Sequence, residues 1–170
     1  MCAFERSEKG MEFIMEERYK SMIVVDLMLT RKNEGNGKKE VLLALRKNTG
    51  YNDGAYELPG GHVDEGEDLM NAMVREADEE LNIKLKVEDL HIEHILHHYK
   101  GNRLKFIISA DKYEGDLEIG EPEKCEKLEW FDIEELPENL EKRAKKVIKE
   151  IENNIFYDNS DFVNYNIEGE

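Results

Sequence analysis

The sequence has few cysteines and no long apolar segment. Cys2 and Cys125 are the two cysteines among 170 residues, which excludes a fold built on a disulfide framework. No apolar run approaches the roughly 18 residues of a membrane-spanning helix. The N-terminus also lacks the apolar core of a secretory signal peptide. We therefore expect a soluble, cytoplasmic protein that does not associate with membranes.

Basic residues are scarce relative to acidic ones. The chain has 24 lysines and arginines against 40 aspartates and glutamates, which gives a formal net charge of −16 at pH 7. A protein this acidic repels nucleic-acid polymers and anionic lipid surfaces, so neither is expected as a partner. A small polyphosphate can still bind, because metal ions can screen the charge of its site.

The length is typical of one domain with a sizeable core. Residues 1–18 are charged and mixed in character, and we treat them as an N-terminal extension, either a strand with a tail or an added helix. Residues 19–155 carry the clear apolar patterns and form the predicted domain. Residues 156–170 are polar with some aromatics, so we predict a C-terminal tail.

Apolar patterns predict two hairpins, a further strand and a final helix. The β-branched run 22–30 is expected to pair with 41–45 across a turn at 33–37 that is rich in Asn and Gly. The later predicted elements are a hairpin of 92–99 with 104–110, a strand at 128–131 and a periodic helix at 140–151.

The most informative segment is residues 61–83, GHVDEGEDLMNAMVREADEELNI. Side chains three and four residues apart are neighbours on a helix, so Glu76, Glu79 and Glu80 should converge on one patch. Like charges at this spacing repel, and burial increases the cost, unless a cation lies among them. Carboxylate oxygens of this kind suit Mg²⁺. The same helix has a separate apolar stripe for the core, formed by Met70, Met73, Val74, Ala77 and Leu81.

The ends of this helix are also marked in the sequence. Gly60 and Gly61 precede it and allow their backbone to approach a ligand or metal closely. Asp68 is the predicted N-cap. Asn82 stands where the helix should stop, because Asn tolerates the left-handed conformation found there.

Arg75 places a positive charge within reach of the acidic patch. It can pair with Glu79, four residues later on the same helix face. It can also reach back to Glu67 in the preceding loop. Together these pairs would fix the loop against the helix.

This segment resembles the signature of the Nudix (MutT-like) hydrolases. The matching positions are Gly61, Glu67, Arg75, Glu76, Ala77, Glu79, Glu80 and Ile83. One position departs, because Asn82 stands where the family usually has glycine, although both residues serve as helix C-caps. The resemblance extends over about residues 19–151. It implies an α/β fold, the Nudix-type α/β/α sandwich with a mixed central sheet.

The resemblance implies an enzyme that hydrolyses a pyrophosphate bond in a nucleoside diphosphate linked to another moiety. The three glutamates would bind Mg²⁺ or Mn²⁺ together with the Gly61 carbonyl. Either Glu76 or Glu80 would deprotonate the attacking water, and Arg75 would orient the glutamates. The structural positions of the signature would be Gly60, Glu67 and Asn82.

The expected partner is a small-molecule nucleotide. A nucleoside triphosphate, including one with an oxidised purine, would give a monophosphate and pyrophosphate. Nucleotide sugars and dinucleotides are the alternatives within the same chemistry. A catalytically weak Nudix-fold sensor that only binds a nucleotide is a different class, and the retention of all three glutamates favours the enzyme. A monomer and a homodimer both stay open.

Five residues outside the signature are candidates for substrate binding. Arg46 follows the 41–45 strand and could meet a phosphate or a base, or be an ordinary surface arginine. The resemblance places Glu121 and Glu123 in a loop where some family members have an extra acid that binds a metal or the base, with solvated acids as the alternative. Tyr51 and Tyr56 could stack on a base, with core packing as the alternative.

A cluster of histidines accompanies the predicted strand at 92–99. Strand alternation would place His91 and His97 on one face, and His94 and His98 on the other. This geometry does not make a metal site by itself.

Overall fold

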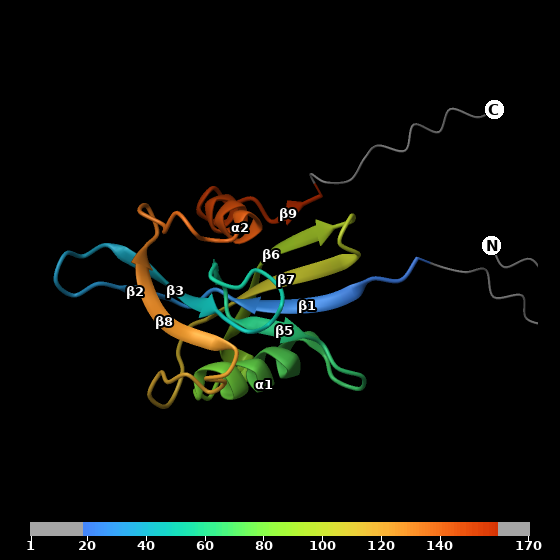
Figure 1. The fold of residues 1–170 in the computed structure, drawn as a ribbon, viewed down its shortest axis with the longest axis horizontal. Helices are drawn as coiled ribbons and strands as arrows, with labels where there is room; N and C mark the ends of the chain where they lie inside the picture. The colour runs from blue at the N-terminus through green and yellow to red at the C-terminus, as the bar shows by residue number, and fades with distance from the viewer. Residues whose placement is uncertain (1–18, 160–170) are drawn as a thin grey trace, which may run out of the picture.

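The protein folds into two β-sheets with a helix on either side (Figure 1). The computed structural model describes residues 19–159. The elements are β1 (Met22–Leu27), β2 (Thr30–Lys32), β3 (Lys39–Arg46), β4 (Tyr56–Glu57), β5 (Gly60–His62), α1 (Leu69–Leu81), a 3₁₀ turn (Val87–Asp89), β6 (Leu90–His98), β7 (Arg103–Ala110), β8 (Cys125–Asp132), α2 (Lys142–Glu152) and β9 (Tyr157–Asp158). In this part of the chain, neither helix is long and apolar enough to cross a membrane.

The larger sheet is mixed and has the strand order β5-β1-β7-β6-β9. The β1–β7 and β6–β9 pairs are parallel, whereas β1–β5 and β6–β7 are antiparallel. The smaller sheet is antiparallel and is built around β3, which pairs with β2, β4 and β8. The β6–β7 pair confirms the predicted second hairpin.

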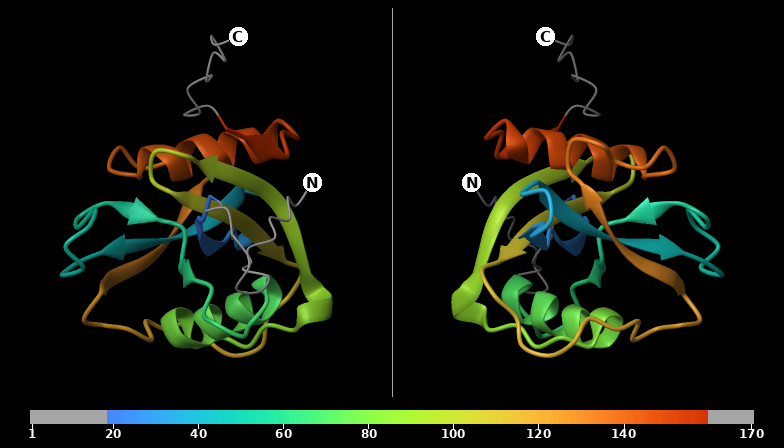
Figure 2. Two further views of the ribbon diagram at one scale, coloured as in Figure 1. Left: turned by 90° about the vertical axis from the view of Figure 1, so that its right-hand side faces the viewer. Right: turned by 90° about the vertical axis from the view of Figure 1, so that its left-hand side faces the viewer.

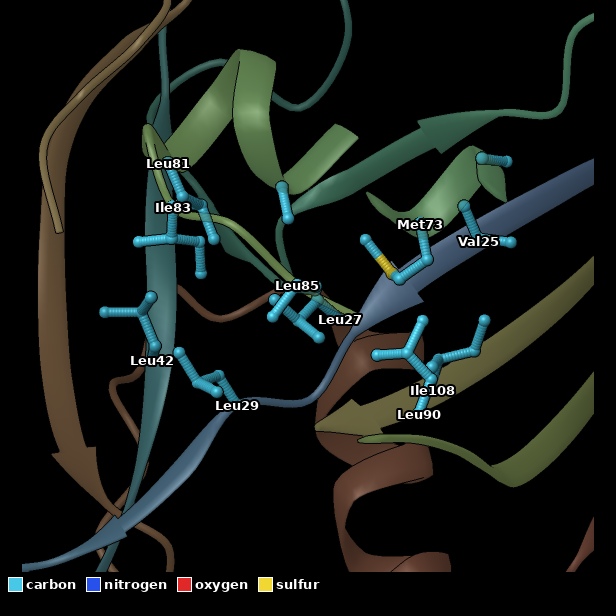
Figure 3. Close-up of a cluster of buried hydrophobic side chains, with 12 residues drawn as sticks. Val25, Leu27, Leu29, Leu42, Met73, Leu81, Ile83, Leu85, Leu90 and Ile108 are labelled. Carbon is cyan, nitrogen blue, oxygen red and sulfur yellow. The ribbon is translucent and has the colours of Figure 1, made fainter. Parts of the chain in front are cut away.

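The two helices cover opposite sides of the sheets, as the turned views show (Figure 2). Neighbouring residues of β7 show the division, because Ile108 belongs to the apolar cluster beside α1 and Ile107 to the cluster beside α2. Met73 and Leu81 of α1 lie in the first cluster (Figure 3). Val147 and Ile148 of α2 lie in the second. The predicted α/β/α sandwich with a mixed sheet is thereby confirmed.

The apolar run 22–30 serves both sheets, which differs from the predicted single strand. Between β1 and β2 the chain crosses from one sheet to the other, where Met28 N donates to Ile108 O at 2.8 Å and Leu42 N donates to Leu29 O at 3.0 Å. Only β2 therefore pairs with β3 in a hairpin. The apolar sequence does not mark this switch, because Leu27, Met28 and Leu29 are all buried.

The C-terminal elements lie close to their predicted positions. The last strand is longer than 128–131, and α2 spans Lys142–Glu152 instead of 140–151. The sheet continues into the predicted tail, since Tyr157 pairs with Ile95 of β6. The predicted extension at 1–18 and residues 160–170 lie outside the described residues.

Candidate active site

Helix α1 carries the acidic patch, and both of its predicted caps are confirmed. The Asp68 carboxylate accepts hydrogen bonds from Met70 N at 3.0 Å and Asn71 N at 2.9 Å. Asn82 ends the helix in the left-handed conformation, with φ 55° and ψ 30°. The buried stripe of α1 fixes its rotation about its own axis. That rotation directs the glutamates of the next turns toward β5.

Arg75 ties the loop to the helix and to the acidic patch. Its guanidinium binds Glu67 Oε1 at 2.7 Å and donates to the His62 carbonyl at 2.9 Å. It also contacts Glu76 at 2.7 Å and Glu79 at 3.1 Å. The hydrogen bonds that Arg75 donates to Glu67, more than those it donates to the other two acids, raise the pKa of Arg75 above its usual range. The predicted pairs with Glu67 and Glu79 are confirmed, and the fork geometry orients two glutamates at once.

Each of the two positions before the helix favours glycine for a different structural reason. Gly60 has φ 146°, and a Cβ atom there would lie 2.1 Å from the Val25 carbonyl oxygen. Its N–H donates to Glu80 Oε2 at 2.8 Å. At Gly61 a Cβ atom would instead lie 2.4 Å from Glu76 Oε1. The bare backbone lets β5 lie close to β1 at Gly60 and directly against the Glu76 carboxylate at Gly61.

Burial and crowding change the acidity of two glutamates. Burial raises the pKa of Glu80 to about 8, the Gly60 hydrogen bond opposes this, and the charges of Glu76 and Glu121 add to the rise. The pKa of Glu76 is raised mainly by burial, against the lowering effect of Arg75. Both shifts arise because carboxylates crowd together in a corner that is shielded from water.

Glu121 reaches the patch because its loop packs on the C-terminal end of α1. Gly120 N donates to Glu80 O at 2.9 Å, and Glu118 N donates to Leu81 O at 3.1 Å. A Cβ atom at Gly120 would lie 1.9 Å from Glu79 O, so the close approach requires glycine. The loop thus caps carbonyls at the helix end and presents an acid to the site.

The acidic patch forms one wall of a cavity of about 420 Å³, a size suited to a small-molecule ligand. Basic side chains also line this cavity, and most of them have a carboxylate partner. The pairs are Arg46 with Glu57 at 3.2 Å, Lys105 with Asp26 at 2.5 Å, Lys124 with Glu121 at 2.6 Å and Arg143 with Glu141 at 3.1 Å.

The structure separates the five predicted substrate residues into two groups. Arg46, Tyr51 and Glu121 line the cavity. Tyr56 does not, and it is core, with 7% of its surface exposed and its hydroxyl donating to Glu129 at 2.6 Å. Glu123 is also outside the lining. The placement of Tyr56 corrects the stacking role considered for it, because β4 buries its ring against β3.

Several lining residues were not singled out in the sequence. Asp26, Arg103 and Lys105 lie on paired strands β1 and β7 and share the cavity face. His98, one of the histidines noted in the sequence, lies opposite Arg103 on β6 and also lines the cavity. A usable signal was present, because Asp26 and Lys105 interrupt strongly apolar strands, where unpaired charges are rare.

The oxygen atoms gathered at this site are of the chemical type that binds a divalent cation. Among residues 19–159, no group of three or more His, Cys, Asp and Glu side chains stands arranged to hold a metal ion. Arg75 accounts for part of this, since it holds Glu76 and Glu79. Crowded, buried carboxylate oxygens with a raised pKa nevertheless suit Mg²⁺ or Mn²⁺. The candidate ligands are Glu76, Glu79, Glu80 and the Gly61 carbonyl.

Comparisons with known proteins agree with this geometry. The model of the NUDIX domain matches residues 22–151. The ADP-ribose pyrophosphatase of Methanocaldococcus jannaschii is 31% identical over 135 residues, covering 75% of this chain and 71% of that protein. The crystal structure of a MutT NUDIX hydrolase from Burkholderia pseudomallei is 26% identical with a TM-score of 0.64, covering 75% of this chain and 95% of that one. The crystal structure of the MutT protein from Methanosarcina mazei Go1 shares the fold. It is 20% identical with a TM-score of 0.65, covering 81% of this chain and 97% of that one.

Proposed function

The chain belongs to the NUDIX domain family, and we propose that it hydrolyses the pyrophosphate bond of a nucleoside diphosphate linked to another moiety, with a divalent cation. The observation that carries the proposal is the position of Glu80. Its buried carboxyl accepts from the Gly60 N–H at 2.8 Å and opens onto a cavity lined by both acidic and basic side chains. Such a cavity can hold a polyphosphate between metal ions bound by the acids and the cationic side chains.

The residues around the cavity suit distinct parts of the reaction. Glu80 or Glu76 would accept the proton of the attacking water, and burial raises the pKa of both above the ordinary carboxyl value, toward the range that suits a general base. Bound Mg²⁺ or Mn²⁺ would supply neutralisation of the charge on the phosphate oxygens. Arg75 would orient Glu76 and Glu79 and would not contact the substrate.

Two substrates are proposed within this chemistry. A nucleoside triphosphate, including one with an oxidised purine, would give a monophosphate and pyrophosphate. ADP-ribose is the second candidate, supported by the similarity to the Methanocaldococcus jannaschii protein. The presence of Glu76, Glu79 and Glu80 together favours turnover over a sensor that only binds.

The test is a panel of nucleotides incubated with Mg²⁺ and pure protein, with products separated by chromatography. The panel contains nucleoside triphosphates, oxidised purine triphosphates, nucleotide sugars, dinucleotides and ADP-ribose. Glu80→Gln should lower kcat by about 10²-fold or more, as expected for loss of a general base or metal ligand. The matched control is Glu138→Gln, an exposed position, which should leave kcat unchanged. Absence of turnover across the panel, with a nucleotide still bound, would favour the sensor.

A further inference from the structure

Arg103 differs from the other basic residues of the cavity wall. Arg46, Lys105, Lys124 and Arg143 are each paired with a carboxylate. Arg103 lines the same cavity but forms no ion pair with any of residues 19–159. Its guanidinium lies over the ring of Tyr51, whose centroid is 5.7 Å from the guanidinium carbon. Its positive charge is therefore available to a ligand.

Tyr51 is held in place by its own loop. The Asp53 carboxylate accepts hydrogen bonds from Thr49 N at 2.9 Å and from Thr49 Oγ1 at 2.6 Å, which closes the turn. Arg46 Nε donates to the Tyr51 carbonyl at 3.0 Å. The ring that contacts Arg103 is thus presented on a pinned turn, which reduces the entropy cost of holding the guanidinium in one place.

Arg103 lies at a distance from the glutamates that one substrate can span. Gly61, Val25 and Phe106 are directly opposite one another on β5, β1 and β7. Arg103 precedes Phe106 by three residues on β7. Standard strand spacing and rise therefore put the Cα atoms of Arg103 and Gly61 roughly 14 Å apart. A phosphate beside the glutamates and a group at Arg103 are then different parts of one ligand.

We propose that Arg103, positioned by the Tyr51 ring, forms an anion subsite that binds a third phosphate of the substrate, beyond the pyrophosphate linkage beside the glutamates. A guanidinium suits this task because it presents several N–H donors to phosphate oxygens. The subsite favours substrates with a distal phosphate, such as a nucleoside triphosphate, over those that end in an uncharged sugar. This inference rests on the proposed function, whose first substrate candidate it supports.

The test measures binding of inorganic triphosphate in Mg²⁺ buffer by titration calorimetry, so it needs no turnover. Arg103→Gln should raise Kd by about tenfold or more, as expected for a lost hydrogen bond between charged groups. Arg103→Lys keeps the charge and should recover most of the affinity. Arg31→Gln is the matched control, because Arg31 also lies over an aromatic ring, Trp130 at 4.3 Å, but is outside the cavity lining.

Two further variants examine the role of the ring. Tyr51→Phe keeps the ring and should bind triphosphate like the wild type, whereas Tyr51→Leu should bind more weakly. In steady-state assays, Arg103→Gln should raise KM for the triphosphate and leave KM for ADP-ribose within about twofold. Wild-type protein that does not bind triphosphate, or Arg103→Gln with unchanged Kd, overturns the subsite. A protein that binds triphosphate through Arg103 but hydrolyses no nucleotide refutes the proposed function alone.

Discussion

The carboxylate of Glu76 lies directly against the backbone of Gly61. A Cβ atom added at Gly61 would stand 2.4 Å from Glu76 Oε1 and 2.6 Å from Glu76 Cδ. Gly61 does not have a positive φ, so alanine suits its backbone conformation. The atoms that would collide belong to the end of a flexible side chain. A methyl group at Gly61 therefore leaves the fold intact but displaces the Glu76 carboxylate.

Gly61→Ala should lower activity without much change in stability. Displacing a catalytic carboxylate by about 1 Å costs on the order of 10²-fold in rate, so kcat/KM should fall by about that factor. The melting temperature should change by less than about 3 °C, which corresponds to about 1 kcal/mol for a chain of this size. Steady-state kinetics and thermal melting provide the two measurements. Full activity in this variant would mean that the place of Glu76 is unimportant.

Gly60→Ala should instead destabilise the fold. Its Cβ atom would lie 2.1 Å from the Val25 carbonyl oxygen and 2.8 Å from Asp26 Cα, and its φ of 146° is unfavourable for alanine. Relief requires backbone movement in the β1–β5 pair, so we expect a loss of about 3 kcal/mol or more in urea unfolding. Gly54→Ala separates the two causes, because Gly54 has φ 83° but open space around it. That control should cost about 1 kcal/mol.

The acidic helix could be predicted from the sequence because the signals that define it are local. The helical period, the Asp68 cap and the Asn82 cap all lie within the same short segment. The Arg75–Glu67 contact spans only one loop. In contrast, the chain crosses between sheets at 28–29, where two buried apolar residues look alike in sequence whichever sheet they join.

The remaining cavity residues depend on pairing between distant segments. Arg103 and Lys105 reach the cavity because β7 runs parallel to β1, and no local pattern encodes that pairing. Tyr51 and Tyr56 are the same residue type five positions apart, yet one is exposed and the other is buried. The difference arises because Tyr56 pairs with Leu45 in the sheet, while Tyr51 lies in the turn before it.

Asn82 occupies a left-handed position that a glycine would also accept. Its φ is 55°, and its side-chain amide makes a long contact with Glu118 at 3.4 Å. Asn82→Gly should therefore change the free energy of unfolding by less than about 0.5 kcal/mol, whereas Asn82→Ala should lose about 1 kcal/mol. Urea unfolding at equilibrium measures both. Equal stability of the alanine and glycine variants would contradict a role for backbone conformation.

The link between Glu67 and Arg75 should give a stability difference that depends on pH. Hydrogen bonding from Arg75 lowers the pKa of Glu67 below its ordinary value of 4.5. The folded-state pKa is depressed, so the stabilisation is present above 4.5 and is lost as the pH falls through the lowered value. Glu67→Gln should melt below the wild type at neutral pH, and the two melting temperatures should converge in acid. A difference in melting temperature that persists in acid would mean that the substitution acts through packing and not through charge.

Glu80 should lower the stability of the metal-free protein, although the proposed reaction requires it. Its carboxyl is buried beside Glu76 and Glu121, and in the metal-free protein this crowding is unfavourable. Glu80→Gln removes the charge and keeps an oxygen that can accept from Gly60 N. In chelator, this variant should therefore melt at or above the wild-type temperature. Added Mg²⁺ should raise the melting temperature of the wild type and have little effect on the variant, because ligand binding stabilises only a protein that binds. Equal responses to Mg²⁺ would remove Glu80 from the metal site.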